Sequence, residues 1–213
     1  MLENFITIKD NNYTAEIVEK KSKFIANLFY VENIEQVEEK IKQVKRQYFD
    51  ARHNCVAYRI VETDSVIERF SDDGEPSGTA GAPMLSILQK NNLCNVLVIV
   101  TRYFGGILLG TGGLVRAYSD ATIKSMELAE KVSKCYGIEA QIEFDYSYFD
   151  TFKYYARKNG IFIRETIYED NVKCIIQLEN KDFETLKEKI TNKSIIVQNL
   201  SVLDKKYISK MEW

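Results

Sequence analysis

Glycine and proline are concentrated in one part of this chain of 213 residues. Eight of the ten glycines and both prolines fall between Gly74 and Gly113. Glycine is favoured where the backbone must adopt a positive φ angle or where another group approaches it closely, and elsewhere it costs conformational entropy. The skew therefore predicts that this span holds the sharply turning loops of the fold and that these loops form its functional surface.

Apolar residues before and between these loops recur with the periods of strands and helices. Asn33 is expected to cap the first helix and Thr79 the second. The third helix follows Gly113 and turns an inner face toward the sheet, formed by Leu114, Tyr118, Ala121, Ser125 and Leu128. The predicted strands cover residues 13–18, 23–31, 52–61, 65–70 (after a turn at 62–64) and 95–100, and the first two helices cover residues 34–48 and about 80–90.

The pattern restarts near residue 134, which predicts a second domain. Strands at 138–144, 161–168, 172–178 and 195–203 alternate with helices at 147–159 and 182–191. The order β-α-β-β-α-β is that of the ferredoxin-like fold. We therefore expect an α+β protein with domains at 1–134 and 135–213.

Composition argues against several classes of protein. The most apolar window, residues 96–100, is far too short to cross a bilayer. Glu3 is acidic where a signal peptide would be positively charged, so the expected location is the cytoplasm, with no membrane partner. The four cysteines form no C-x-x-C pair and His53 is the single histidine, so we expect neither disulfides nor a metal or other cofactor.

The formal net charge is −2, and neither half of the chain carries a clear surplus of either sign. Nucleic-acid-binding proteins usually show a basic surplus. Any contact with RNA must therefore be local.

The second glycine cluster joins a strand to a helix, where free backbone N–H groups can bind anions. Its glycines, Gly105, Gly106, Gly110, Gly112 and Gly113, lie between Arg102 and Arg116. The lysine of a nucleotide-binding P-loop is missing, so an unconventional anion site at residues 105–113 is one interpretation. The other is that the glycines let the helix pack closely on the sheet. Tyr103 and Phe104 suit base stacking, or packing in the core.

The first cluster contains three carboxylates, Asp72, Asp73 and Glu75, followed by Thr79. Such a group could bind Mg²⁺ or act in acid–base chemistry, or it could form an exposed turn whose side chains cap local N–H groups.

His53 and Cys55 share one face of a predicted strand. They could form a nucleophilic pair, although a structural role is more typical of such residues.

Four sequence blocks resemble the signature of the YigZ/IMPACT family. They are SKFI at Ser22, HNCVAY at His53, DDGEPSGTAGAP at Asp72 and RYFGGILLGTGGLVRAY at Arg102. The resemblance implies an N-terminal domain with the ribosomal-protein-like β-α-β fold of the fourth domain of elongation factor G. It also implies a C-terminal domain like the fifth domain of that factor. Eukaryotic relatives regulate translation by binding a regulator scaffold, through an additional N-terminal domain that does not resemble any part of this chain.

The leading hypothesis is a binding protein that engages RNA or a ribosome-associated protein through residues 72–83 and 102–116. The alternative is a hydrolase or phosphate-handling enzyme that uses His53, Asp72, Asp73, Glu75 and Arg102 in one cleft, which requires that these groups converge. A protein–protein adaptor is the third possibility, and it requires an exposed apolar patch.

Overall fold

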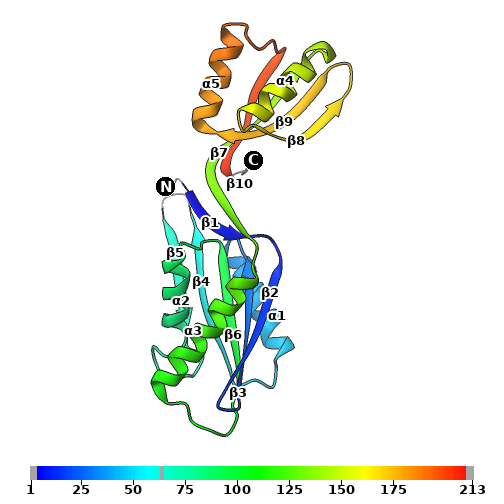
Figure 1. Cartoon of the computed structure of the whole chain (residues 1–213). Coiled ribbons are helices and arrows are strands. Elements are labelled where there is room, and N and C mark those ends of the chain that lie inside the picture. The colour runs from blue at the N-terminus through cyan, green and yellow to red at the C-terminus, as the bar shows by residue number, and fades with distance from the viewer. Residues whose placement is uncertain (1–3, 63–64, 210–213) are drawn as a thin grey trace. The chain divides into compact units, whose positions relative to one another are not determined.

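A computed structural model describes residues 4–62 and 65–209 of the chain. Residues 1–3, to which the expectation about Glu3 applies, and residues 63–64 of the predicted turn lie outside the described residues. The chain divides into two compact units, Met1–Val132 and Ser133–Trp213. Each unit combines helices with an antiparallel sheet, so the predicted two-domain α+β fold is confirmed (Figure 1).

The N-terminal unit is built on a sheet with the strand order β2-β3-β6-β4-β5, in which every neighbouring pair is antiparallel. Helix α1 connects β3 to β4, and these two strands run parallel on either side of β6, which gives the predicted β-α-β unit. The elements are β1 (Asn4–Ile8), β2 (Asn12–Glu19), β3 (Ser22–Tyr30), α1 (Ile34–Gln47), β4 (His53–Val61), β5 (Val66–Ser71), α2 (Gly81–Lys90), β6 (Val96–Tyr103) and α3 (Gly110–Leu128).

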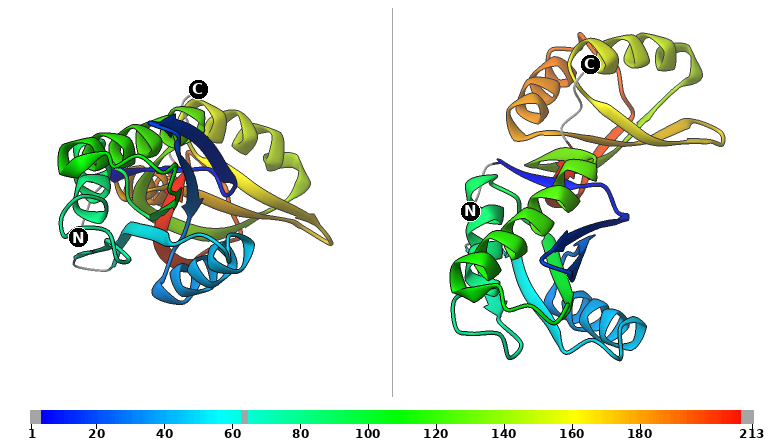
Figure 2. Two further views of the ribbon diagram at one scale, coloured as in Figure 1. Left: turned by 90° about the horizontal axis from the view of Figure 1, so that it is seen from below. Right: turned by 60° about the horizontal axis from the view of Figure 1, so that its bottom comes forward.

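Helices cover both faces of this sheet: α1 lies on one face, and α2 and α3 lie on the other (Figures 1 and 2). The central strand β6 is buried on both sides, which explains its unbroken apolar run. Leu97 and Ile99 pack with α1, whereas Val98 and Val100 pack with α2 and α3. Burial of the two faces holds the ends of the strands in a fixed register, and the candidate site lies at one of these ends.

Helix ends confirm one predicted cap and correct another. The Asn33 side chain accepts a hydrogen bond from the Gln36 N–H at 2.9 Å, as predicted. The prediction for Thr79 is wrong, because its hydroxyl donates to the Pro76 carbonyl at 2.6 Å and Ala80 occupies the cap position of α2. Leu128, predicted on the inner face of α3, is 58% exposed because the helix ends there.

The C-terminal unit has the strand order β8-β9-β7-β10, which with its β-α-β-β-α-β sequence confirms the ferredoxin-like topology. Both of its helices contribute to the core, through Phe149 and Phe152 of α4 and Leu186 of α5. The final strand begins at Asn199 and ends at Ser209, later than predicted. The elements are β7 (Lys131–Phe144), α4 (Tyr146–Lys158), β8 (Phe162–Tyr168), β9 (Val172–Glu179), α5 (Asn180–Thr191) and β10 (Asn199–Ser209).

The carboxylate of Glu139 in β7 is buried and accepts hydrogen bonds from Lys206 at 2.8 Å, Arg164 at 2.8 Å and Gln177 at 2.7 Å. Within the described parts of both units, no helix has the length and apolar character needed to cross a bilayer.

Candidate functional site

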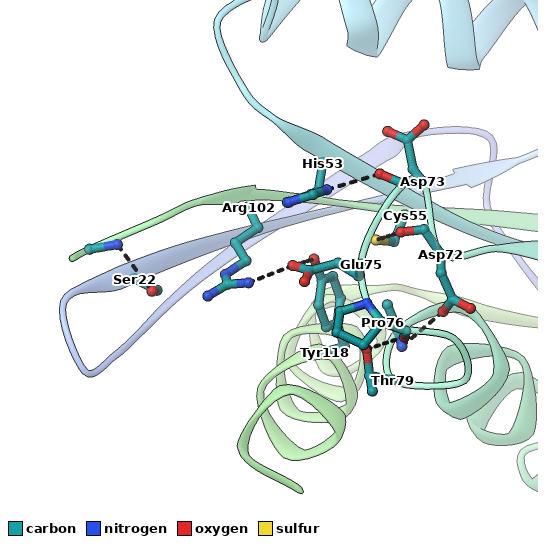
Figure 3. A network of polar contacts seen from close by, with 12 residues as sticks. Ser22, His53, Cys55, Asp72, Asp73, Glu75, Pro76, Thr79, Arg102 and Tyr118 are labelled. Carbon is teal, nitrogen blue, oxygen red and sulfur yellow. Dashed lines mark hydrogen bonds and ion pairs between the residues drawn. The ribbon is translucent and has the colours of Figure 1, made fainter. Parts of the chain in front are cut away.

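The segment between β5 and α2 is organised by the carboxylate of Asp72. Its oxygens accept hydrogen bonds from the backbone N–H groups of Gly78 at 2.9 Å, Ala80 at 3.0 Å and Gly81 at 2.8 Å (Figure 3). Two of these groups belong to the first turn of α2, where N–H groups have no partner within the helix. Asp72 therefore performs the capping role that the sequence assigned to Thr79, from nine residues before the helix.

Asp73 ties the same segment to the sheet. Its carboxylate accepts from the Asn54 N–H at 2.7 Å and pairs with Lys45 at 3.1 Å. Its carbonyl oxygen lies 2.9 Å from Nδ1 of His53. A carbonyl oxygen can only accept a hydrogen bond, so Nδ1 carries a hydrogen. The other ring nitrogen, Nε2, has no hydrogen-bond partner among the residues that the structure describes.

Glu75 and Arg102 form a buried ion pair at the end of β6. Arg102 Nη1 donates to Glu75 Oε1 at 2.7 Å, and the two side chains are 8% and 3% exposed. The hydroxyl of Tyr118, on α3, donates to the same oxygen at 2.8 Å. Burial raises the pKa of Tyr118, and the neighbouring Cys55 and Glu75 raise it further, so the phenol remains protonated. Glu75 thus fixes the position of the guanidinium from one side.

The Arg102 guanidinium is also held between two aromatic rings. Its central carbon lies 5.5 Å from the centroid of Phe24 and 5.6 Å from that of Phe104. Both distances are within the range of cation–π contacts. Phe24 is fully buried and packs edge-on against Tyr118, whereas Phe104 is 55% exposed. The buried Nε of Arg102 has no hydrogen-bond partner among the described residues.

The segment between β6 and α3 lies open to solvent. Phe104, Ile107 and Leu108 are exposed, the last by 82%. Gly106 and Gly110 have φ angles of +83° and +74°, and a Cβ on either would meet no atom within 4 Å. No side chain caps the first turn of α3, whose N–H groups have no partner within the helix.

Close packing explains some of the glycines and not others. A Cβ on Gly105 would lie 2.0 Å from the Lys21 carbonyl carbon, so this glycine is required where the segment crosses the β2–β3 turn. The Gly105 N–H donates to the Ser22 hydroxyl at 3.1 Å. A Cβ on Gly113 would lie 3.0 Å from the Leu109 Cβ, whereas Gly112 has open space around it. Arg116 is exposed and has no partner among the described residues.

The β2–β3 turn brings positive charge to this surface. Glu19 pairs with Ser22, so Lys20 and Lys21 form a two-residue hairpin turn. Their φ angles are +45° and +65°, values that strongly favour glycine or asparagine. Both lysines are exposed, and the backbone of Lys21 lies next to Gly105. They supply local positive charge, although the net charge of the chain is slightly negative.

Tyr103 does not belong to this surface. Successive residues of a strand point to opposite faces, so Tyr103 projects away from Arg102 and its hydroxyl donates to Asp50 at 2.7 Å. This hydrogen bond raises the pKa of Tyr103 to about 12, with smaller contributions from burial and from the charge of Asp50. The ring that accompanies Arg102 is that of Phe104.

Two alternatives from the sequence lose their chemical basis. Cys55 is fully buried, its thiol donates to the Asp72 carbonyl at 3.0 Å, and burial raises its pKa to about 12. Nδ1 of His53 is bonded to the Asp73 carbonyl and the Cys55 thiol to the Asp72 carbonyl, so His53 and Cys55 do not form a nucleophile and base pair. Asp72 and Asp73 are occupied by backbone N–H groups, and no cluster of three or more metal-binding side chains occurs in residues 4–62 and 65–209.

Comparison with known proteins places the chain in a family. A model of the Impact N-terminal domain matches residues 20–126, and a model of a domain of unknown function, DUF1949, matches residues 142–194. The chain is 37% identical to the IMPACT family member YvyE of Bacillus subtilis over 191 residues, which cover 90% of this chain and 87% of that protein.

The chain belongs to the IMPACT family. It is 36% identical to the family member of Haemophilus influenzae over 187 residues, which cover 86% of this chain and 91% of that one. A crystal structure of a hypothetical protein matches 97% of the chain and 100% of its own length, with a TM-score of 0.64 and 29% identity. The predicted YigZ/IMPACT membership is therefore confirmed, and all four signature blocks lie within or next to the site: Ser22, His53, Asp72 and Arg102 each contribute to it.

The residues singled out in the sequence fall into two groups in the structure. His53, Glu75 and Arg102 converge, whereas Asp72, Asp73 and Thr79 shape the segment around them (Figure 3). Phe24 and Tyr118 were not predicted to take part. Phe24 lies directly opposite Arg102 in the sheet, and only the register of β3 against β6 reveals this.

Proposed function

We propose that this IMPACT-family protein is a translation-linked binding protein that engages RNA through residues 102–116. Residues 72–83 hold this segment in place through the pairing of Glu75 with Arg102. The translational role comes from the family resemblance, and the choice of RNA comes from the site. The observation that carries the proposal is Arg102, a buried guanidinium that Glu75 engages through Nη1 alone.

The neighbours of Arg102 suit single-stranded RNA. The half-exposed ring of Phe104 can stack on a base, and Lys20, Lys21 and Arg116 are exposed cations that can contact phosphates. Since the formal net charge is only −2 and the basic residues are local, binding should involve few phosphates and weaken with salt.

The test is RNA filter binding together with co-sedimentation with ribosomes, across a range of salt concentrations. Phe104→Ala should weaken RNA binding by about 1–3 kcal/mol, the usual contribution of one base stack. Phe49→Ala is the matched control, because Phe49 is 84% exposed, follows α1 and belongs to neither residues 72–83 nor residues 102–116. Absence of RNA binding even at low salt would refute the proposal.

A ribosome-associated protein is a second candidate partner. The exposed Ile107 and Leu108, beside Phe104, form the kind of apolar patch that a protein partner covers. Association with ribosomes that survives nuclease treatment and is lost in Leu108→Asp would favour this partner over RNA.

A phosphate-handling hydrolase is the second candidate function, favoured by the geometry of His53. Its Nδ1 is fixed by Asp73, which leaves Nε2 available next to Arg102 on the adjacent strand. Asp72 and Asp73 are unavailable as acid or base, so the chemistry would rest on His53 and Glu75. Phosphate release from phosphomonoesters that disappears in His53→Ala would support it.

A further inference from the structure

We infer that Arg102 binds a terminal phosphate monoester of RNA through its Nε–Nη2 edge. This inference rests on the proposed RNA-binding function and names the group that the site recognises.

The guanidinium offers two hydrogen-bonding positions beyond the one that Glu75 uses. Nη1 donates to Glu75 Oε1, whereas Nε is buried without a partner and Nη2 has no hydrogen-bond partner among the described residues. Nε–H and the nearer Nη2–H are parallel and form the side-on fork with which arginine binds two oxygens of one carboxylate or phosphate. A buried polar atom without a partner requires an explanation, and a ligand oxygen supplies one.

The fork is fixed before any ligand arrives. Glu75 holds Nη1, and the rings of Phe24 and Phe104 lie within 5.6 Å of the guanidinium carbon. A side chain that is already ordered loses little entropy when it binds. Phe104 is 55% exposed, so the guanidinium has a fully buried ring on one side and a half-exposed ring on the other.

The depth of the fork favours a chain end over a backbone phosphate. The Arg102 side chain is only 8% exposed. A phosphodiester has only two non-bridging oxygens and carries a nucleoside on each side, so two substituents would have to fit beside a buried side chain. A terminal monoester has three free oxygens and a single substituent, so it can enter with its oxygens first.

His53 provides a third polar group beside Arg102 and is half-buried. It lies opposite Arg102 across the β4–β6 pairing, and its Nε2 has no partner in the described part of the chain. With Nδ1 held by Asp73, the imidazole orientation is fixed. Nε2 can accept a hydrogen from a singly protonated phosphate, or donate one to a doubly charged phosphate when the ring is protonated.

The experiment uses the full chain and one eight-nucleotide RNA prepared with a 5′-phosphate, a 3′-phosphate or hydroxyl groups at both ends. Fluorescence anisotropy at low salt should show at least one phosphorylated form binding about tenfold or more tightly than the hydroxyl form, as expected for a charged bidentate contact. The two phosphorylated arms distinguish the two ends, and inorganic phosphate should compete with the preferred form.

Arg102→Lys keeps the charge next to Glu75 but lacks the fork, so it should abolish the preference for the phosphorylated RNA. Arg157→Lys, at an exposed arginine on α4 outside the proposed surface, is the control and should retain it. The comparison of RNA ends in the unaltered protein does not depend on whether the variants fold.

Equal affinity for all three RNAs would overturn the inference and leave the RNA-binding function standing. Failure of every RNA to bind would overturn both. Binding of a glutamate-rich peptide in place of RNA would also overturn it, because the fork would then serve a carboxylate of a protein partner.

Discussion

Glu75→Gln should destabilise the N-terminal unit strongly, because it leaves the charge of Arg102 buried without its counter-ion. The two side chains are 8% and 3% exposed and joined at 2.7 Å. Removing one member of a buried ion pair typically costs about 3–5 kcal/mol. Glutamine has nearly the same shape as glutamate, and its amide oxygen can still accept hydrogen bonds from Arg102 and Tyr118. Nη2 of Arg102 is not among the fully buried atoms without a partner. We therefore expect the lower end, about 3 kcal/mol.

Glu68→Gln is the matched control in the same sheet. Glu68 also pairs with an arginine at 2.7 Å, but its side chain is 31% exposed. Arg59 keeps hydrogen bonds to the carbonyls of Leu93 at 2.9 Å and Leu88 at 3.4 Å when Glu68 is neutralised. The cost should therefore be about 1 kcal/mol or less.

Hydrogen exchange of the β6 amides under native conditions measures the opening free energy of this unit without interference from the other. The double variant Arg102→Met/Glu75→Gln should recover much of the loss, since it buries no unpaired charge. The reasoning fails if Glu75→Gln costs no more than Glu68→Gln, or if the double variant is less stable than Glu75→Gln alone.

Two further predictions test other features. Gly105→Ala should lower the free energy of unfolding, measured by urea denaturation, several times more than Gly112→Ala. A Cβ at position 105 would lie 2.0 Å from the Lys21 carbonyl carbon, whereas a Cβ at position 112 would meet no atom within 4 Å. Similar losses of stability in the two variants would contradict the close approach at Gly105. In the C-terminal unit, burial alone would raise the pKa of Glu139, but hydrogen bonds from Lys206 and Gln177 and the charges of Lys206 and Arg164 lower it below the ordinary 4.5. A carboxylate whose pKa is lower in the folded than in the unfolded state stabilises the fold at pH values above its unfolded pKa. This stabilisation is lost as the pH falls below about 4.5. The free energy of unfolding measured against pH should therefore show an acid-induced decrease that Glu139→Gln lacks.

Local patterns in the sequence were sufficient to predict most elements of this fold. Asn33 stands directly before a helical period, and the apolar run of β6 indicated a strand covered on both faces. Both signals act over a few residues. The cap of α2 could not be found in this way, because Asp72 reaches it across a loop and Thr79 occupies the position that local rules favour.

The site shows the same division between local and long-range information. The glycine skew and the carboxylates singled out the candidate segments from local sequence. The pairing of Glu75 with Arg102 joins residues 27 apart in the chain and depends on the register of β6. One feature could have been predicted: Arg102 and Tyr103 are neighbours in a strand, so alternation alone places them on opposite faces. The three carboxylates looked equivalent in sequence, yet only Glu75 faces the guanidinium.

The turn at Lys20 and Lys21 carries a consequence for how this protein can change. Asparagine and glycine would relax its backbone, whose φ angles are both positive, and would thereby make the hairpin more favourable. The same replacement would remove two cations from the rim around Gly105. A replacement that stabilises this turn would therefore also lower the positive charge beside Gly105.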